Sequence, residues 1–165
     1  MKRYTEYNHY VMDIKNLKPT AGGRYKQGYY QLKNPLKYRG DKNKIIYRSS
    51  WELKFMMLLD LSSEITEWGS EPFPIRYFFP IDCKYHEYFV DFYFVRDGHK
   101  YLVEVKPTKD LTRPQKPKRM TKKAVASYNY QMNAFLKNYY KKIAADEFAK
   151  KNNCRYVYLT ENSKL

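Results

Sequence analysis

Two carboxylates and a lysine, Asp91, Glu104 and Lys106, have a spacing that could support metal-assisted hydrolysis. Between them lies Asp97-Gly98, a dipeptide typical of a two-residue hairpin turn, because both central positions of a type I′ turn need a positive φ angle. With that turn, Asp91 is directly opposite Glu104. Lys106 is then on the same face as Glu104, because side chains alternate along a strand. A three-residue loop would shift this register by one.

Two opposed carboxylates need a compensating charge. Like charges facing each other across a ladder cost roughly 0.2–1 kcal/mol when exposed, so Lys106, a bound divalent cation or both must offset them. Two carboxylates, waters and a substrate phosphate are ligands that Mg²⁺ usually accepts. The metal would polarise a scissile phosphate, and Lys106 would position or deprotonate the attacking water and offset developing charge. The alternative is an exposed sheet face with an ordinary Glu–Lys pair.

Upstream of this hairpin, a helix is expected from about Ser49 to Leu61. Ser49 is a plausible N-cap, and Glu52 three residues later completes a capping box. Helix initiation alone would explain Glu52, but from the first turn it could also supply a third carboxylate to the site. Helical spacing predicts a buried stripe made of Trp51, Phe55, Leu58 and Leu59.

The rest of the chain is expected to alternate strands and helices. Strands are predicted over residues 75–79, 86–95, 100–106 and 155–159, a loop over 107–122 and a long helix over about 121–151. These elements describe an α/β fold with a mixed sheet flanked by helices. The apolar residues expected to share the core face of the hairpin are Tyr88, Val90, Phe92, Phe94, Tyr101, Val103 and Val105, while Phe89, Tyr93 and Leu102 flank the acids on the other face.

Composition restricts the class of protein. The 165 residues carry 32 Lys and Arg against 17 Asp and Glu, a formal net charge of +15, which points to a polyanionic partner such as nucleic acid. No apolar stretch approaches the roughly 20 residues that span a bilayer, and no signal peptide is expected. Cys83 and Cys154 cannot form a disulfide framework, and no CxxC suggests zinc. We therefore expect an intracellular protein without a membrane partner.

Two basic segments are candidates for contact with the partner. Residues 1–46 read as a Tyr- and Gly-rich arm before a domain of residues 47–165; the arm could follow a nucleic acid strand, or could pack its tyrosines on the core. The predicted loop could hold the substrate backbone without reading its sequence, or be a solvated linker. Its basic residues, within or beside it, are Lys109, Arg113, Lys116, Lys118, Arg119, Lys122 and Lys123.

The sequence around the hairpin resembles the PD-(D/E)xK nuclease superfamily, which has the restriction-endonuclease-like fold. The short pattern of Asp91 followed by Glu104-Val105-Lys106 is common by chance, but the wider string is more specific. It resembles the head completion nucleases of T-even-like tailed phages and the catalytic subunit of heteromeric-transposase endonucleases. The matching segments are Tyr47-Arg48-Ser49-Ser50-Trp51-Glu52, Ser70-Glu71-Pro72, Tyr88-Phe89-Val90-Asp91-Phe92 and Val103-Glu104-Val105-Lys106-Pro107, within residues 30–161.

The resemblance implies a role for each matching residue. Asp91 and Glu104 would bind Mg²⁺, with Mn²⁺ tolerated, and the carbonyl of Val105 would be a third ligand. Lys106 would be the catalytic lysine and Glu52 the helical acid. The family often draws a further polar residue from the long helix, where the candidates are Gln131, Asn138 and Lys141. The chain has Val90 where the superfamily pattern has a proline, a position that varies.

The resemblance also implies a cellular role, an endonuclease that acts on double-stranded DNA when phage heads are completed after packaging. It implies contact with head or portal proteins, in the host cytoplasm or in the virion. Two alternatives stay open at this point. The chain could be a non-catalytic protein that binds DNA or the portal on a nuclease fold, or a basic RNA-binding domain. Oligomeric state and strand preference do not follow from the sequence.

Overall fold

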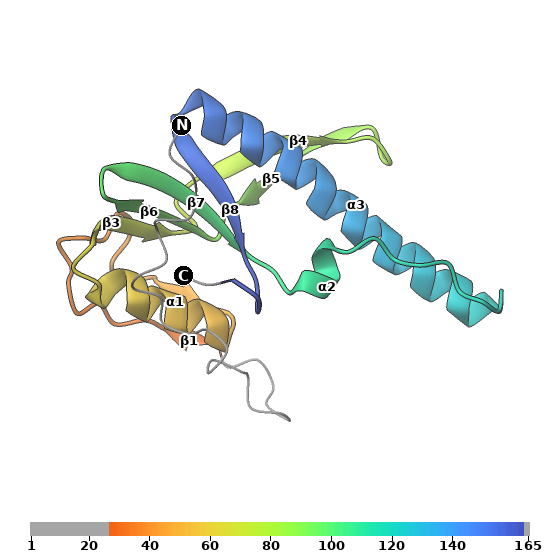
Figure 1. Cartoon of the computed structure of the whole chain (residues 1–165), viewed down its shortest axis with the longest axis horizontal. Coiled ribbons are helices and arrows are strands. Elements are labelled where there is room, and N and C mark those ends of the chain that lie inside the picture. The colour runs from red at the N-terminus through yellow and green to blue at the C-terminus, as the bar shows by residue number, and fades with distance from the viewer. Residues whose placement is uncertain (1–26, 164–165) are drawn as a thin grey trace.

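The computed structural model describes residues 27–163, in which a mixed four-stranded sheet lies at the centre (Figure 1). Its strand order is β3-β6-β7-β8, from β3 (Ile65–Ser70), β6 (Phe92–Arg96), β7 (His99–Val105) and β8 (Cys154–Leu159). The pairs β3–β6 and β6–β7 are antiparallel, and β7–β8 is parallel. The predicted mixed sheet is therefore confirmed.

One face of this sheet is covered by α1 (Ser50–Leu61). Phe55, Met56 and Leu59 of α1 pack on Phe92 and Phe94 of β6. Ser49 caps the helix, as predicted, and its hydroxyl accepts from the backbone N–H of Glu52 at 3.1 Å. Of the predicted stripe, Phe55 and Leu59 are buried, whereas Trp51 and Leu58 are only half-buried. The buried set also contains Met56 and Asp60.

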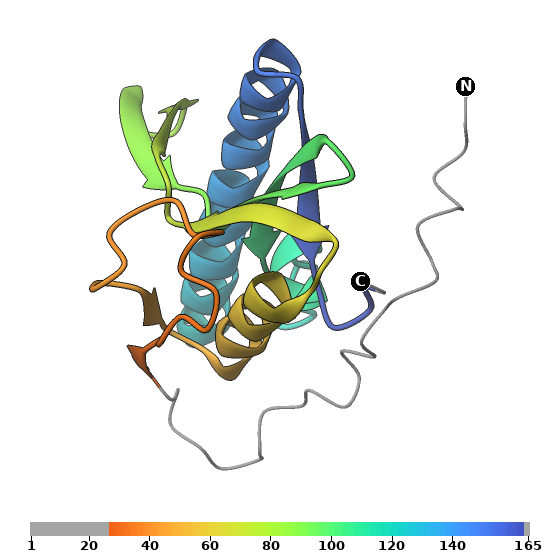
Figure 2. The same ribbon diagram turned by 90° about the vertical axis from the view of Figure 1, so that its left-hand side faces the viewer.

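The other face is covered by α3 (Lys122–Lys151) and by a ribbon of β4 (Pro74–Phe79) and β5 (Lys84–Phe89). Ala145 and Ala149 of α3 pack with Leu102 of β7 and Val90, so both faces of the sheet are buried. Figure 2 shows α1 and α3 on opposite sides of the sheet. The predicted long helix is confirmed, and it runs unbroken over 30 residues.

The single strand predicted over residues 86–95 is wrong. The chain forms β5 up to Phe89, leaves strand geometry at Val90 and Asp91, and starts β6 at Phe92 in a different sheet. Because this break disrupts the alternation of faces, Tyr88 and Val90 pack on the α3 side and not with Phe92. Strand β3 was missed because its Thr, Glu, Gly and Ser residues dilute the apolar pattern.

Several short elements complete the structure. A two-stranded pair joins β1 (Gly28–Tyr29) and β2 (Ile46–Tyr47), and α2 (Thr108–Leu111) lies in the predicted loop. Tyr30 and Tyr38 are buried against Trp68, so these tyrosines of the predicted arm pack on the core. Residues 1–26 of that arm lie outside the described residues. Within the described part, no helix is both long and apolar enough to cross a membrane.

Candidate active site

The β6–β7 hairpin sets the register of the candidate site. Asp97 and Gly98 have φ angles of 50° and 72°, as a type I′ turn requires, and Phe92 pairs with Val103 as predicted. The ladder ends at that pair, so Asp91 lies one residue beyond it. Its carboxylate accepts from the backbone N–H of Val105 at 2.7 Å, and its carbonyl accepts from that of Glu71 at 3.0 Å. Asp91 is therefore held beside Glu104 by hydrogen bonds and not by strand pairing.

Glu104 is a buried carboxylate, with 3% of its surface exposed. It pairs with Tyr158 of β8 in the sheet and lies on the face covered by α3. The Lys106 Nζ is 3.2 Å from Glu104 Oε1. Glu104 Oε2 is buried and has no hydrogen-bond partner among the described residues. The alternative of an exposed sheet face with an ordinary Glu–Lys pair is therefore wrong for this glutamate.

The buried charges perturb one another. Burial, reinforced by the charge of Glu104, raises the pKa of Asp91 to about 7. For Lys106, burial favours the neutral amine, but attraction to Glu104 and Asp91 outweighs it and raises the pKa above its ordinary value. The ammonium of Lys106 therefore lies beside two carboxyl groups whose charges oppose each other.

This arrangement fits a divalent cation. No three His, Cys, Asp or Glu side chains within residues 27–163 gather closely enough to chelate a metal by themselves. Mg²⁺ does not need such a cage, because it keeps several waters and usually takes one or two carboxylates together with substrate phosphate. The oxygen that such a cation could meet is Glu104 Oε2, which is buried and has no hydrogen-bond partner among the described residues.

Glu52 lies at the start of α1 and serves as a cap. Its carboxylate accepts from the backbone N–H of Arg48 at 2.8 Å and from the hydroxyl of Ser49 at 3.0 Å. It also lies close enough to contribute to the raised pKa of Asp91. Glu52 thus lies at the edge of the site and also caps α1.

The long helix brings one of its three candidates close to the acids. The Lys141 Nζ is 4.8 Å from the centre of the Tyr88 ring; burial lowers the pKa of its amine, and Glu104 and Asp91 act on it electrostatically. Asn138 donates to the carbonyl of Asp110 in α2 at 3.2 Å, so it holds α2 in place. Gln131 is exposed and donates to the hydroxyl of Ser127, one turn earlier in the same helix, at 3.1 Å.

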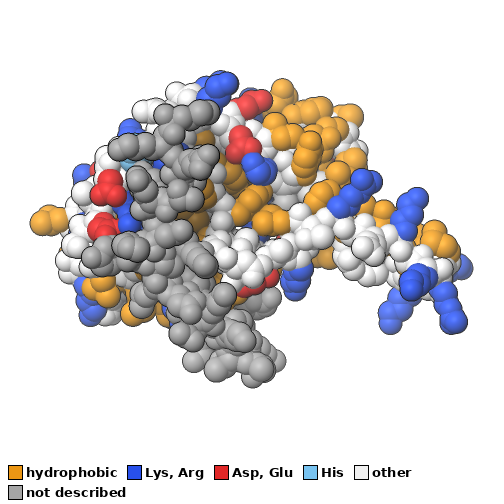
Figure 3. All heavy atoms as spheres, viewed as in Figure 1, with side chains coloured by type: hydrophobic (Ala, Val, Ile, Leu, Met, Phe, Trp, Pro, Cys, Tyr) orange, Lys and Arg blue, Asp and Glu red, His pale blue; other side chains and the backbone are white. Residues whose placement is uncertain are grey.

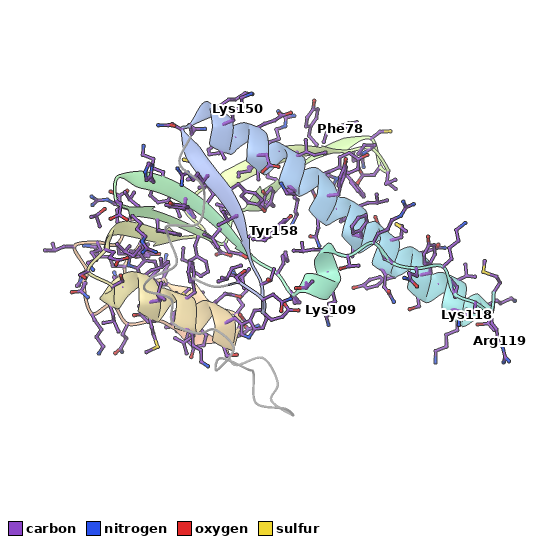
Figure 4. All side chains as sticks on the ribbon, viewed as in Figure 1. Phe78, Lys109, Lys118, Arg119, Lys150 and Tyr158 are labelled. Carbon is purple, nitrogen blue, oxygen red and sulfur yellow. The ribbon has the colours of Figure 1, made fainter. Side chains whose placement is uncertain are left out.

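The basic residues of the predicted loop do not gather at the acids. Lys109 lies on α2, whereas Lys118 and Arg119 lie at the far end of a projection of the molecule (Figure 4). Arg113 and Lys116 are exposed in the segment that leads there.

An ion pair at the rim of the site was not predicted from the sequence. Arg48, just before α1, pairs with Glu71, just after β3, through Arg48 Nη2 and Glu71 Oε2 at 3.3 Å, among other contacts. The backbone N–H of Glu71 donates to the carbonyl of Asp91, so this pair fixes the loop that presents Asp91. Arg48 and Glu71 both lie in the segments quoted for the resemblance, which was the available signal.

Comparisons with known proteins agree with this geometry. The family described as TnsA-like endonuclease N terminal matches residues 62–161, a range that includes Asp91, Glu104 and Lys106 but not Glu52. The head completion nuclease of Enterobacteria phage T4 is 37% identical over 137 residues, covering 82% of this chain and 91% of that protein. The mixed sheet between α1 and α3 is the restriction-endonuclease-like fold expected of such enzymes. The chain therefore belongs to the TnsA-like endonuclease family and is a nuclease.

Proposed function

We propose that this chain is a Mg²⁺-dependent DNA endonuclease that acts in phage head completion after DNA packaging. The observation that carries the chemistry is Glu104, a buried carboxylate whose Oε2 lacks a partner beside Asp91 and Lys106. A DNA-binding structural protein has no need for that costly arrangement, because a buried charge is retained only when something compensates for it.

The metal ligands in this proposal are the carboxylates of Asp91 and Glu104 and the carbonyl of Val105. When bound there, Mg²⁺ would polarise the scissile phosphate and acidify a water, and Mn²⁺ has the same preference for oxygen ligands. Asp91 is oriented for this by the N–H of Val105, which fixes one of its oxygens.

Lys106 is the proposed catalytic lysine. Its ammonium is 3.2 Å from Glu104 Oε1, and its side chain keeps 27% of its surface exposed, so it faces both the acids and the solvent. From there it can orient the attacking water and stabilise charge that develops on the phosphate. Glu52 adds negative charge from the helix side, and Lys141 is placed to contact substrate from α3.

The role in head completion rests on the relative from phage T4, whose printed name is head completion nuclease. With 91% of that protein covered, the similarity extends over nearly its whole length and not only over the catalytic motif. The substrate in this proposal is double-stranded DNA, the place of action is the cytoplasm of the infected host, and head or portal proteins are the expected assembly partners.

The test is cleavage of supercoiled plasmid with Mg²⁺ and with EDTA. Wild-type protein should nick or cut only with Mg²⁺, and Lys106→Ala or Glu104→Gln should lower the rate by roughly 10²-fold or more, as expected for loss of a positioned charge in the transition state. Lys100→Ala on the same strand and Glu87→Gln on β5 are matched controls with exposed side chains, and both should cleave like wild type. Equal cleavage by all five proteins would refute the proposed site.

A further inference from the structure

A basic arm projects from the body of the molecule next to the candidate active site. The arm consists of residues 112–136, which are the extended segment after α2 and the first half of α3 (Figure 1). None of these residues is fully buried, whereas Ala145 and Ala149 in the second half of α3 are in the core. A helix of 30 residues is thus anchored at one end and projects at the other.

The arm is stiffened by its own extended segment. Val125, Tyr128, Met132 and Phe135 of α3 recur at helical spacing and are half-buried, although the central sheet ends before this part of the helix. The segment between α2 and α3 runs alongside this half of the helix in Figure 1. Pro114 and Pro117 favour an extended backbone in that segment. An isolated helix of about 15 residues, the length of the projecting part, would be marginal in water, so we infer that the neighbouring segment stabilises it.

All charged side chains of the arm are basic. The arm, residues 112–136, contains six Lys and Arg, and it lies within a longer stretch, residues 111–145, that has nine Lys and Arg and no Asp or Glu. Lys and Arg side chains gather at the free end of the arm, where Lys118 and Arg119 lie (Figures 3 and 4). Elsewhere the described surface mixes signs, as in the ion pairs Arg39–Glu67 and Arg96–Glu64. An uncompensated run on a projecting element is complementary to a polyanion.

The arm starts at the candidate site, and its length fixes how far it reaches. Asn138 ties α3 to α2 at Asp110, four residues after Lys106. From Asn138 to Lys122 the helix advances by about 24 Å, at 1.5 Å per residue. That distance corresponds to roughly seven base pairs of duplex, at 3.4 Å per pair.

We propose that this arm binds the phosphate backbone of duplex DNA on one side of the cut, about seven base pairs from the scissile phosphate. This inference rests on the proposed endonuclease function and adds the substrate requirement: a duplex flank long enough to reach the end of the arm. Lys116, Lys118 and Arg119 make the far contacts. They position the duplex without reading its sequence, because they meet phosphates and not base edges.

Exposed Tyr130 and Met120 on the arm would also suit a protein partner. The charge favours DNA, because six of the arm's 25 residues are basic and none is acidic. A protein partner, or a second copy of this chain, is therefore treated as an outcome of the test.

The test compares a tip variant, Lys116→Gln/Lys118→Gln/Arg119→Gln, with a control that loses the same charge elsewhere, Lys42→Gln/Lys100→Gln/Lys150→Gln. The three control lysines are exposed, and Lys150 lies at the opposite end of α3 (Figure 4). Binding of a 24-base-pair duplex is measured in EDTA over a range of salt concentrations. Cleavage of the same blunt, end-labelled duplex is mapped with Mg²⁺. A second tip variant, Lys122→Gln/Lys123→Gln, guards against misfolding of the first.

Loss of three phosphate contacts should lower the slope of log K against log salt by about 2.7 and weaken binding roughly tenfold or more, while the control changes little. Wild-type cuts should avoid the last roughly seven base pairs at an end, and the tip variants should lose this avoidance. Tip variants with the same salt slope and the same cut positions as the control would overturn the inference. If the tip variants lost only self-association or binding of a partner protein, the arm would be a protein-binding surface instead. Failure of wild-type protein to cut any duplex would refute the endonuclease proposal instead.

Discussion

The capping of α1 by Glu52 can be tested separately from its proposed part in catalysis. Its carboxylate closes the capping box of α1 and also lies near Asp91. A capping box accepts Gln as well as Glu, so Glu52→Gln keeps the cap and removes only the charge. Glu52→Ala removes both.

We predict that Glu52→Gln melts within about 0.5 kcal/mol of wild type but cleaves plasmid at least about tenfold more slowly. Glu52→Ala should lose activity and in addition about 1 kcal/mol of stability, the usual value of a cap. Thermal melts followed by circular dichroism and initial rates of nicking give the two readouts. If Glu52→Gln cleaves as fast as wild-type protein, Glu52 only caps the helix and has no part in catalysis.

At the scale of elements, a buried aspartate fastens the N-terminal segment to α1. Asp60 is fully buried, and its carboxylate accepts from the hydroxyl of Tyr30 at 2.9 Å and from the backbone N–H groups of Lys33 and Asn34 at 2.7 and 3.0 Å. Its carbonyl accepts from the Asn34 side chain at 2.8 Å. The carboxylate alone thus satisfies three donors of a segment that has little regular structure.

We predict that Asp60→Ala destabilises the protein by about 3–5 kcal/mol, because it removes the buried acceptor of three donors and leaves a cavity. Tyr30→Phe removes a single hydrogen bond and should cost about 1 kcal/mol. Asp41→Ala, an exposed aspartate in the same segment, should stay within about 0.5 kcal/mol of wild type. Urea denaturation measures all three, and an Asp60→Ala protein as stable as the Asp41→Ala control would contradict this account.

The elements also show what local sequence could predict. The β6–β7 hairpin followed from Asp97-Gly98, and α1 followed from its cap, because turn and cap chemistry depend on neighbouring residues only. The break at Val90 and Asp91 could not be predicted, since continuous alternation hides a switch from one sheet to another. Asp60 was missed for the same reason: its partners lie 26 to 30 residues away and are invisible to a local pattern.

The candidate site was predictable in its residue types but not in its geometry. Asp91, Glu104 and Lys106 follow from the hairpin, yet the burial of Glu104 depends on α3, which arrives from later in the chain. The contribution of Arg48 and Glu71 likewise depends on α1 and β3 meeting in space. Packing between segments that are distant in the sequence decides which charges are compensated, and residue spacing does not predict that packing.

At the scale of the whole molecule, basic and acidic side chains gather in different places. The arm of residues 112–136 exposes basic side chains at its free end, while Glu104 of the candidate site is buried and Asp91 half-buried. A basic exterior attracts DNA over about 10 Å or more at moderate salt, whereas the buried acids attract only what enters the site. In the proposed function these two charge patterns serve different partners, a polyanion outside and a small cation inside.

The inner cation should consequently appear in the global stability. A ligand that binds only the folded state at ten times its Kd adds about 1.4 kcal/mol, which is roughly 3–6 °C in Tm for a chain of this size. We predict such a rise for wild-type protein in Mg²⁺, reversed by EDTA, against NaCl of equal ionic strength. Glu104→Gln should melt within about 1 kcal/mol of metal-free wild type, because relief of the repulsion from Asp91 offsets the lost pair with Lys106, which still interacts with Asp91. It should show no rise with Mg²⁺. Because Glu87→Gln leaves the site untouched, it should retain the full rise, so equal shifts in all three proteins would place the cation elsewhere.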